Sequence, residues 1–311
     1  MKLSIVTTMY KSAPYVEEFH RRASDAASKL TGDFEIIFVN DGSPDASLSI
    51  AIELSKRDPR VTVVDLARNF GHHKAMMTGL SYARGERIFL VDCDLEEEPE
   101  LLLDFASRMD EWGCDVVYGV QGERKGGFVE RISGEIFYRA INYLSGIEMP
   151  RNIVTARLMS RRYVESLLEY REREVFLAGI WHITGYDQRP LVITKHSKGT
   201  STYDLSRKFS VIINSVTSFS NRPLRFIFYT GIAISFISLL YIAKLVYSKL
   251  IYGIQVEGWT SLIVSVWLLG GMTISFLGVI GIYLSKIFLE VKARPYSTVR
   301  AVYEGRKRKN A

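Results

Sequence analysis

The chain has 311 residues, of which 47% are hydrophobic and 24% charged, and its formal net charge is +6. This composition is that of a globular protein, and the length leaves room for one large domain with additions. The positive balance favours contact with anionic phosphates or lipid headgroups, without choosing between them. The two cysteines, Cys93 and Cys114, provide neither metal-ligand spacing nor a disulfide framework, so a reducing compartment is the simpler location.

Apolar runs alternate with helical patterns along the first part of the chain. We expect strands at residues 3–8, 34–39, 61–66, 87–91 and 115–119, and helices at residues 13–30, 46–57, 74–84 and 100–112. This alternation predicts an α/β fold in which helices cover a mostly parallel sheet through right-handed crossovers. Further along, a helix is expected at 132–144, and strands at 156–159 and 191–195 are expected to finish the sheet.

Residues 88–99, IFLVDCDLEEEP, run from an apolar strand directly into carboxylates. Asp92 and Asp94 would therefore lie at the carboxyl edge of the sheet, where open α/β folds place their ligands. Hard oxygen ligands at this edge suit Mg²⁺ or Mn²⁺ that also holds substrate phosphates. The simpler interpretation is that the acids cap the next helix, and we prefer it for Glu97 and Glu98.

The last third of the chain predicts a membrane anchor. Residues 226–246 and 261–288 are apolar runs long enough to span a bilayer, and glycines in the second permit close helix contact. Before them, residues 204–220 carry an amphipathic stripe, which favours a helix lying on the membrane over a buried core face. Basic residues flank both outer ends of the pair, which places both ends in the cytoplasm.

These patterns predict four segments. Residues 1–203 would form a cytoplasmic catalytic domain and residues 204–225 a juxtamembrane amphipathic helix. Residues 226–288 would form two transmembrane helices with a short loop, and residues 289–311 a cytoplasmic basic tail. The expected location is the inner (plasma) membrane, as a multi-pass protein whose catalytic domain faces the cytoplasm.

Several motifs occur in order over nearly the whole chain. They are SIVTTMYKSAPYVEEF, EIIFVNDGSPDAS, ARNFGHHKAMMTGLSYARGERIFLVDCDLEEEPELL, VVYGVQGER, RLMSRR, KGTSTY and EVKARPYSTVR. Together they resemble the membrane-anchored family 2 glycosyltransferases, and are similar to dolichol-phosphate mannose synthases and bactoprenol glucosyltransferases. The resemblance implies a GT-A fold and inverting transfer of a sugar from a nucleotide-diphosphate sugar, with UDP favoured, to a polyprenyl phosphate.

The resemblance also assigns residues by position. Nucleotide-sugar binding falls to Thr8, Tyr10, Asp41 and Arg68. Catalysis falls to Asp92, Asp94 and Arg157, and the metal, Mg²⁺ or Mn²⁺, to Asp92, Asp94 and Glu96. Contacts to the acceptor phosphate would come from Arg124, Arg131 and Lys198, although the Gly-rich basic loop at 119–127 is equally consistent with a solvated surface loop. The implied partners are the lipid, the membrane and a possible second copy of the chain, without nucleic acid.

Three positions depart from the family pattern. Lys11 replaces the common Asn, Glu96 replaces the common Gln, and Thr155 stands where bactoprenol glucosyltransferases have Asp. A hydroxyl acceptor needs a base to remove its proton, whereas a lipid phosphate, with a second pKa of about 6, is already an oxyanion at neutral pH. The missing carboxylate therefore favours a phosphate acceptor, or a base elsewhere in the chain.

Other functions remain open from the sequence. The first alternative is transfer of a sugar to a lipid-linked saccharide in surface polysaccharide assembly. A processive synthase is disfavoured because the Q-x-x-R-W signature is absent and two spans are few for a secretion channel. The intact D-x-D and NDGSPD motifs disfavour an inert anchoring subunit. His72 and His73 match no recognised spacing, and we interpret them as structural.

Overall fold

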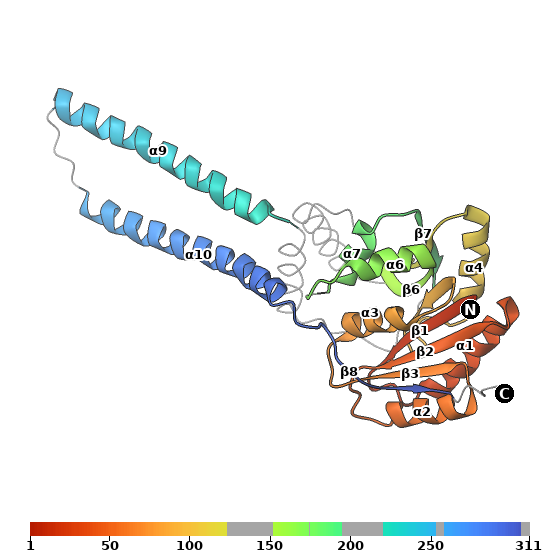
Figure 1. Ribbon diagram of the computed structural model, residues 1–311. Coiled ribbons are helices and arrows are strands. Elements are labelled where there is room, and N and C mark those ends of the chain that lie inside the picture. The colour runs from red at the N-terminus through yellow and green to blue at the C-terminus, as the bar shows by residue number, and fades with distance from the viewer. Residues whose placement is uncertain (123–151, 174, 195–219, 253–257, 306–311) are drawn as a thin grey trace. The chain divides into compact units, whose positions relative to one another are not determined.

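The computed structural model describes residues 1–122, 152–173, 175–194, 220–252 and 258–305 (Figure 1). The chain divides into two compact units. The first contains Met1–Tyr138, Ile147–Asp204 and Arg294–Ala311, and the second contains Arg139–Gly146 and Leu205–Ala293. The predicted helix at 132–144 and nearly all of the amphipathic stripe at 204–220 lie outside the described residues.

An eight-stranded sheet organises the first unit, in the order β7-β5-β6-β4-β1-β2-β3-β8. The strands are β1 (Leu3–Met9), β2 (Phe34–Asn40), β3 (Val61–Leu66), β4 (Arg87–Leu90), β5 (Val116–Gln121), β6 (Ile153–Ser160), β7 (Gln188–Ile193) and β8 (Val299–Glu304). Strands β4, β1, β2 and β3 are parallel neighbours, as are β5 and β7, whereas β6 and β8 run antiparallel to theirs. The predicted mostly parallel α/β fold is confirmed.

Helices cover both faces of this sheet. They are α1 (Val16–Leu30), α2 (Ser47–Arg57), α3 (His72–Tyr82), α4 (Leu101–Trp112), α6 (Arg161–Glu169) and α7 (Leu177–Ile183). Helix α1 contacts α2 and α4, and its buried stripe joins one core cluster with alternate strand residues such as Ile5 and Phe38. Phe19 of α1 meets Phe38 edge to face, with ring centroids 5.8 Å apart. Helices α3 and α6 contact each other on the other face.

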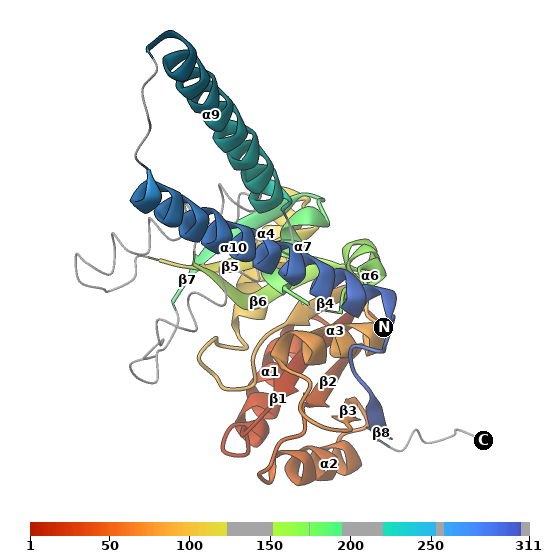
Figure 2. The same cartoon turned by 90° about the vertical axis from the view of Figure 1, so that its left-hand side faces the viewer.

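Strand β8, like helices α6 and α7, is an element that the sequence patterns did not predict. It follows the last apolar run and pairs antiparallel with β3, in a register that places Val63 opposite Tyr303 (Figure 2). Its residues alternate between half-buried and exposed, as expected for an edge strand. The chain therefore returns to the first unit after the apolar helices.

The second unit contains two long apolar helices, α9 (Arg222–Tyr252) and α10 (Trp259–Val291). Within them, Arg222–Tyr241 and Ser265–Val291 are long and apolar enough to cross a membrane. Their apolar side chains are exposed, with 69% of Phe226 and 80% of Trp267 accessible. Pro223 lies in the first turn of α9, where a missing N–H costs no helical hydrogen bond.

Gly85 lies at a crowded junction between β1, β2 and β4. Its N–H donates to Ser4 Oγ at 2.7 Å, and this hydroxyl donates to Glu35 Oε1 at 2.7 Å. The buried Glu35 carboxylate is ion-paired with Arg84 at 2.7 Å. A Cβ added at Gly85 would lie 2.5 Å from Ser4 N and 2.7 Å from Leu3 C. These contacts are to backbone, so a larger residue would have to displace β1.

We expect Gly85→Ala to lower the free energy of unfolding of the first unit by about 1–3 kcal/mol, because overpacked sites store strain of this size. Gly32→Ala is the matched control, since a Cβ at Gly32 meets nothing within 4 Å. Thermal unfolding of both variants in detergent measures the difference. Equal midpoints would contradict the prediction.

Candidate active site

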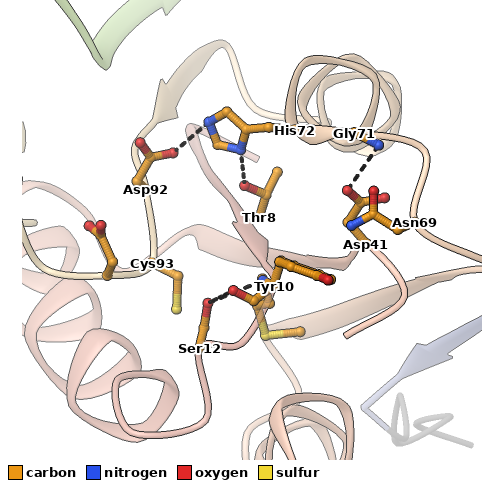
Figure 3. Close-up of a pocket in the computed structure, with 11 residues that line it drawn as sticks. Thr8, Tyr10, Ser12, Asp41, Asn69, Gly71, His72, Asp92 and Cys93 are labelled. Carbon is orange, nitrogen blue, oxygen red and sulfur yellow. Dashed lines mark hydrogen bonds and ion pairs between the residues drawn. The ribbon is translucent and has the colours of Figure 1, made fainter. Parts of the chain in front are cut away.

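A pocket opens at the carboxyl ends of the parallel strands, where open α/β folds bind their ligands (Figure 3). The described residues that line it are Thr8, Met9, Tyr10, Ser12, Asp41, Asn69, Gly71, His72, Asp92, Cys93 and Asp94. They come from the ends of β1, β2 and β4, from the loop after β3 and from the start of α3. The structure thus brings together five residues that the sequence assigned to the site, which are Thr8, Tyr10, Asp41, Asp92 and Asp94.

Asp41 fixes the loop that follows β3. Its Oδ1 accepts a hydrogen bond from the Phe70 N–H at 2.7 Å, and its Oδ2 accepts one from the Gly71 N–H at 3.1 Å (Figure 3). The next residue, Gly42, has φ +61°, and a Cβ there would lie 2.5 Å from the Arg68 carbonyl carbon. Only glycine fits such a close approach without strain. Asp41 therefore positions pocket residues in addition to lining the pocket.

A second carboxylate, Asp45, ties the loop after β1 to the loop after β2. It accepts hydrogen bonds from the Ala13 N–H at 3.0 Å and from the hydroxyls of Ser43 and Ser47, each at 2.5 Å. Burial works against the charged form, but these hydrogen bonds outweigh it and hold the pKa of Asp45 well below its usual range. The Lys11 N–H donates to Ser43 Oγ at 2.8 Å. This loop carries Tyr10 at the pocket.

Lys11, one of the departures from the family pattern, has a left-handed backbone with φ 55°. Asn adopts this conformation more readily than Lys, because its short polar side chain bonds locally. The position where the family commonly has Asn therefore requires a left-handed backbone conformation, and in this chain Lys11 adopts it although Lys is less suited to it.

His72 joins two of the predicted pocket residues. Its Nδ1 lies 3.1 Å from Thr8 Oγ1, and its Nε2 lies 3.2 Å from Asp92 Oδ1 (Figure 3). Partial burial lowers the pKa of His72, but the Asp92 carboxylate and the more distant charges of Asp41 and Glu97 outweigh this effect, so the pKa is raised. The sequence offered a structural role for this residue, and the structure places it in the pocket lining.

His73 differs from its neighbour. Its Nδ1 lies 3.0 Å from the Val175 carbonyl oxygen, and its ring meets Phe176 edge to face. Here a structural role fits. The signal that distinguishes the two is position, since His72 is the first residue of α3, directly after the loop that Asp41 fixes.

Two of the three carboxylates assigned to the metal are placed where they could bind a hard divalent cation. Asp92 and Asp94 both line the pocket, and Asp94 Oδ1 accepts the Glu96 N–H at 3.0 Å. Glu96 is not among the lining residues, and within the described ranges no three His, Cys, Asp or Glu side chains form a metal-binding group. Two carboxylates suit Mg²⁺, which keeps several waters and takes further oxygens from substrate phosphates.

Glu97 has a role that the sequence did not predict. It is fully buried, and its Oε1 and Oε2 accept the backbone N–H groups of Thr155 and Ala156 at 3.3 Å and 2.6 Å. The expected helix-capping role is wrong for it, because α4 begins at Leu101 without a side-chain capping bond. The antiparallel pairing of β6 with β4 brings the N–H groups of Thr155 and Ala156 beside the loop after β4. Glu97, which lies on that loop, accepts both of them.

Arg157, assigned by resemblance to catalysis, lies inside the protein. It is 1% exposed, and its guanidinium donates to the carbonyls of Thr155 at 3.2 Å and Val154 at 3.3 Å. Its Cζ lies 3.0 Å from the centroid of the Trp181 ring. Burial lowers the pKa of Arg157 to about 9. Arg157 is absent from the described pocket lining.

The remaining assigned cations are placed differently. Arg68 is exposed, stacks on the Phe70 ring at 4.3 Å and donates to the Asn69 carbonyl at 3.2 Å, so it lies beside the pocket lining without belonging to it. Arg124, Arg131 and Lys198 lie outside the described residues. Their assignment to the acceptor phosphate stays a prediction.

The sheet, its covering helices and the acidic pocket at the strand ends form a GT-A-type fold. Residues 4–168 match the family model described as glycosyl transferase family 2, and the chain belongs to this family. It is 50% identical over 97% of its length to a Mycobacterium tuberculosis protein named as a glycosyltransferase, covering 89% of that protein. It is 32% identical to the SfII prophage-derived bactoprenol glucosyl transferase of Shigella flexneri, covering 98% of this chain and 99% of the relative.

We expect Glu97→Gln to lower the free energy of unfolding by about 1–3 kcal/mol, because Gln has one acceptor oxygen where the N–H groups of Thr155 and Ala156 need one each. Glu98→Gln is the control, since the Glu98 side chain is 45% exposed and lies 3.8 Å from Arg22. It should change stability by less than about 0.5 kcal/mol. Denaturant unfolding in detergent measures both, and equal losses would contradict the prediction.

Proposed function

We propose that this protein is an inverting glycosyltransferase that moves a sugar from a UDP-sugar to a polyprenyl phosphate at the cytoplasmic face of the membrane. The observation that carries the proposal is the 32% identity to a bactoprenol glucosyl transferase over 98% of this chain, a match that includes both apolar helices. The family alone supports sugar transfer, whereas a match over the apolar helices supports a lipid acceptor.

The reaction we propose is a single displacement. An oxygen of the lipid phosphate attacks the anomeric carbon of the donor, the bond from that carbon to the nucleoside diphosphate breaks, and the configuration inverts. The acceptor is already an oxyanion near neutral pH, so this step needs no base. Thr155 in place of Asp is therefore compatible with this acceptor.

The pocket residues have distinct parts in this proposal. Tyr10, 48% exposed, offers an aromatic face to the nucleotide base, and Thr8 lines the same wall. Asp92 and Asp94 would hold Mg²⁺ or Mn²⁺, which when bound supplies positive charge for the leaving diphosphate. His72 orients Asp92 through their 3.2 Å contact.

The chain connectivity supports a membrane hairpin with both ends on one side. The first unit contains residues on either side of the two helices, because Arg294–Ala311 belong to the same unit as Met1–Tyr138. If α9 and α10 each cross the bilayer once, the two outer ends of this helix pair lie on the same side of the membrane. The basic residues outside the hairpin then favour the cytoplasmic face.

The proposal is tested with the full chain in detergent, Mn²⁺, undecaprenyl phosphate and a panel of nucleotide sugars, by mass spectrometry of lipid-extracted products. We expect one sugar on one lipid phosphate, with UDP released. Product formed only from a lipid-linked saccharide would favour the alternative transferase. Failure with every donor and acceptor would overturn the proposal.

Asp94→Ala should reduce this activity by at least about 100-fold, because it removes a carboxylate that would hold the divalent cation, and the cation would supply the positive charge that stabilises the leaving diphosphate. Asp104→Ala, an exposed residue in the first turn of α4, should leave it unchanged. EDTA should abolish the activity, and Mg²⁺ or Mn²⁺ should restore it. Full activity in EDTA would remove the metal from the proposal.

His72→Ala should lower kcat/KM by about 10–100-fold, the usual cost of removing a group that orients a ligand-binding carboxylate. His73→Ala is the matched control, since the His73 ring contacts the Val175 carbonyl and the Phe176 ring, and His73 is not among the described lining residues. Initial rates of the same product assay measure both. Equal rates for the two variants would contradict the role of His72.

A further inference from the structure

Both backbone groups of Ala67, at the start of the pocket loop, are bound by the segment that returns after α10. The Ala67 N–H donates to the Thr298 carbonyl at 2.9 Å, and Arg300 Nη2 donates to the Ala67 carbonyl at 2.5 Å. Residues 68–72 follow Ala67 directly and include the lining residues Asn69, Gly71 and His72. The returning segment thus holds the first residue of the loop.

The same guanidinium reaches the loop after β2 through a buried carboxylate. Arg300 Nη1 lies 3.6 Å from Asp65 Oδ2, and Asp65 Oδ1 accepts from Asn40 Nδ2 at 2.8 Å. Asn40 Oδ1 in turn accepts the Ser43 N–H at 3.2 Å. Asp65 is 1% exposed, so this carboxylate requires partners of opposite charge or hydrogen-bond donors. Arg300 therefore contacts the loop after β3 directly and the loop after β2 through Asp65 and Asn40, and both loops contribute residues to the pocket.

The pocket loop is held from its two ends by different parts of the chain. Asp41 binds the N–H groups of Phe70 and Gly71, and the returning segment binds Ala67. Arg68 and Asn69 span the distance between these anchors. Release of either anchor would let Asn69 and the start of α3 move relative to β1, and would widen the range of positions that the pocket walls adopt.

We propose that Arg300 is a positioning residue for nucleotide binding, which acts by fixing Ala67 and Asp65 behind the pocket. This inference rests on the proposed function, because it takes the nucleoside diphosphate of the donor as the ligand. Arg300 itself is not among the lining residues, and its side chain is 60% exposed. Its removal should therefore weaken donor binding while leaving the fold and the chemical step in place.

The test compares Arg300→Ala with Arg189→Ala in the full chain in detergent, by titration calorimetry with UDP. Arg189 is the matched control, since it lies on β7 at the opposite edge of the sheet, pairs with Asp187 at 2.9 Å and is 45% exposed. We expect Arg300→Ala to raise the Kd for UDP about tenfold, equal to about 1.4 kcal/mol, and Arg189→Ala to change it less than twofold. Unfolding midpoints of both variants report whether the fold is kept.

Two readouts separate positioning from a general loss of stability. In the product assay, Arg300→Ala should raise the KM for the donor and leave kcat and the KM for the lipid unchanged within about twofold. The reason is that the substitution weakens binding of the donor equally in the ground state and in the transition state. Arg300→Lys should recover part of the UDP affinity, since a single ammonium replaces the two-point contact of the guanidinium. Amide exchange of residues 67–71 should accelerate in Arg300→Ala alone.

The outcomes are distinguishable. Equal UDP affinity of the wild-type protein and Arg300→Ala, or equal losses in Arg300→Ala and Arg189→Ala, would overturn the inference and leave the proposed function standing. A fall in kcat without a change in the donor KM would overturn it as well. A wild-type protein that neither binds UDP nor forms product would overturn both the proposed function and this inference.

Discussion

The Asp41 carboxylate is the constraint on which the pocket depends. A buried carboxylate must be met by donors, and an irregular loop has backbone N–H groups that need acceptors. Asp41 satisfies both needs, because its two oxygens take the N–H groups of Phe70 and Gly71. Helix α3 begins at the next residue, so the direction of its first side chain, His72, follows from this contact. A substitution of Asp41 would thus alter the geometry of the pocket as well as any contact that its carboxylate makes to a ligand.

The part of the fold that the sequence predicted is the part with parallel strands buried on both faces. Strands β1 to β3 are buried along their whole length, so their sequences are rich in apolar and β-branched residues, and α1 between β1 and β2 carries a clear apolar stripe. Once the strands are known to be parallel, the residues after their carboxyl ends must share one edge. Asp92 and Asp94 were predictable for this reason and Asp41 from the family resemblance, although neither their partners nor their distances were.

The features that escaped prediction depend on contacts between distant segments. Glu97 became a structural residue because β6 pairs with β4 and presents Thr155 and Ala156 to it. The same strand turns Arg157 inward, against Trp181, where charge patterning alone predicts an exposed cation. His72 carries no spacing signal, since its partners, Thr8 and Asp92, lie on two other elements. The local sequence pattern determines whether a segment forms a helix or a strand. The partner of a side chain depends instead on how distant strands are paired.

The edge position of β8 has a consequence for biosynthesis. Arg300 and Ala67 are bonded across 233 residues of sequence, and both apolar helices lie between them. During translation the outer edge of β3 therefore stays unpaired until the hairpin has left the ribosome and the chain has turned back. Unpaired edges are templates for association with other chains. Closure of the sheet at β3 thus requires that both apolar helices have been made and that the chain after them has returned to this edge.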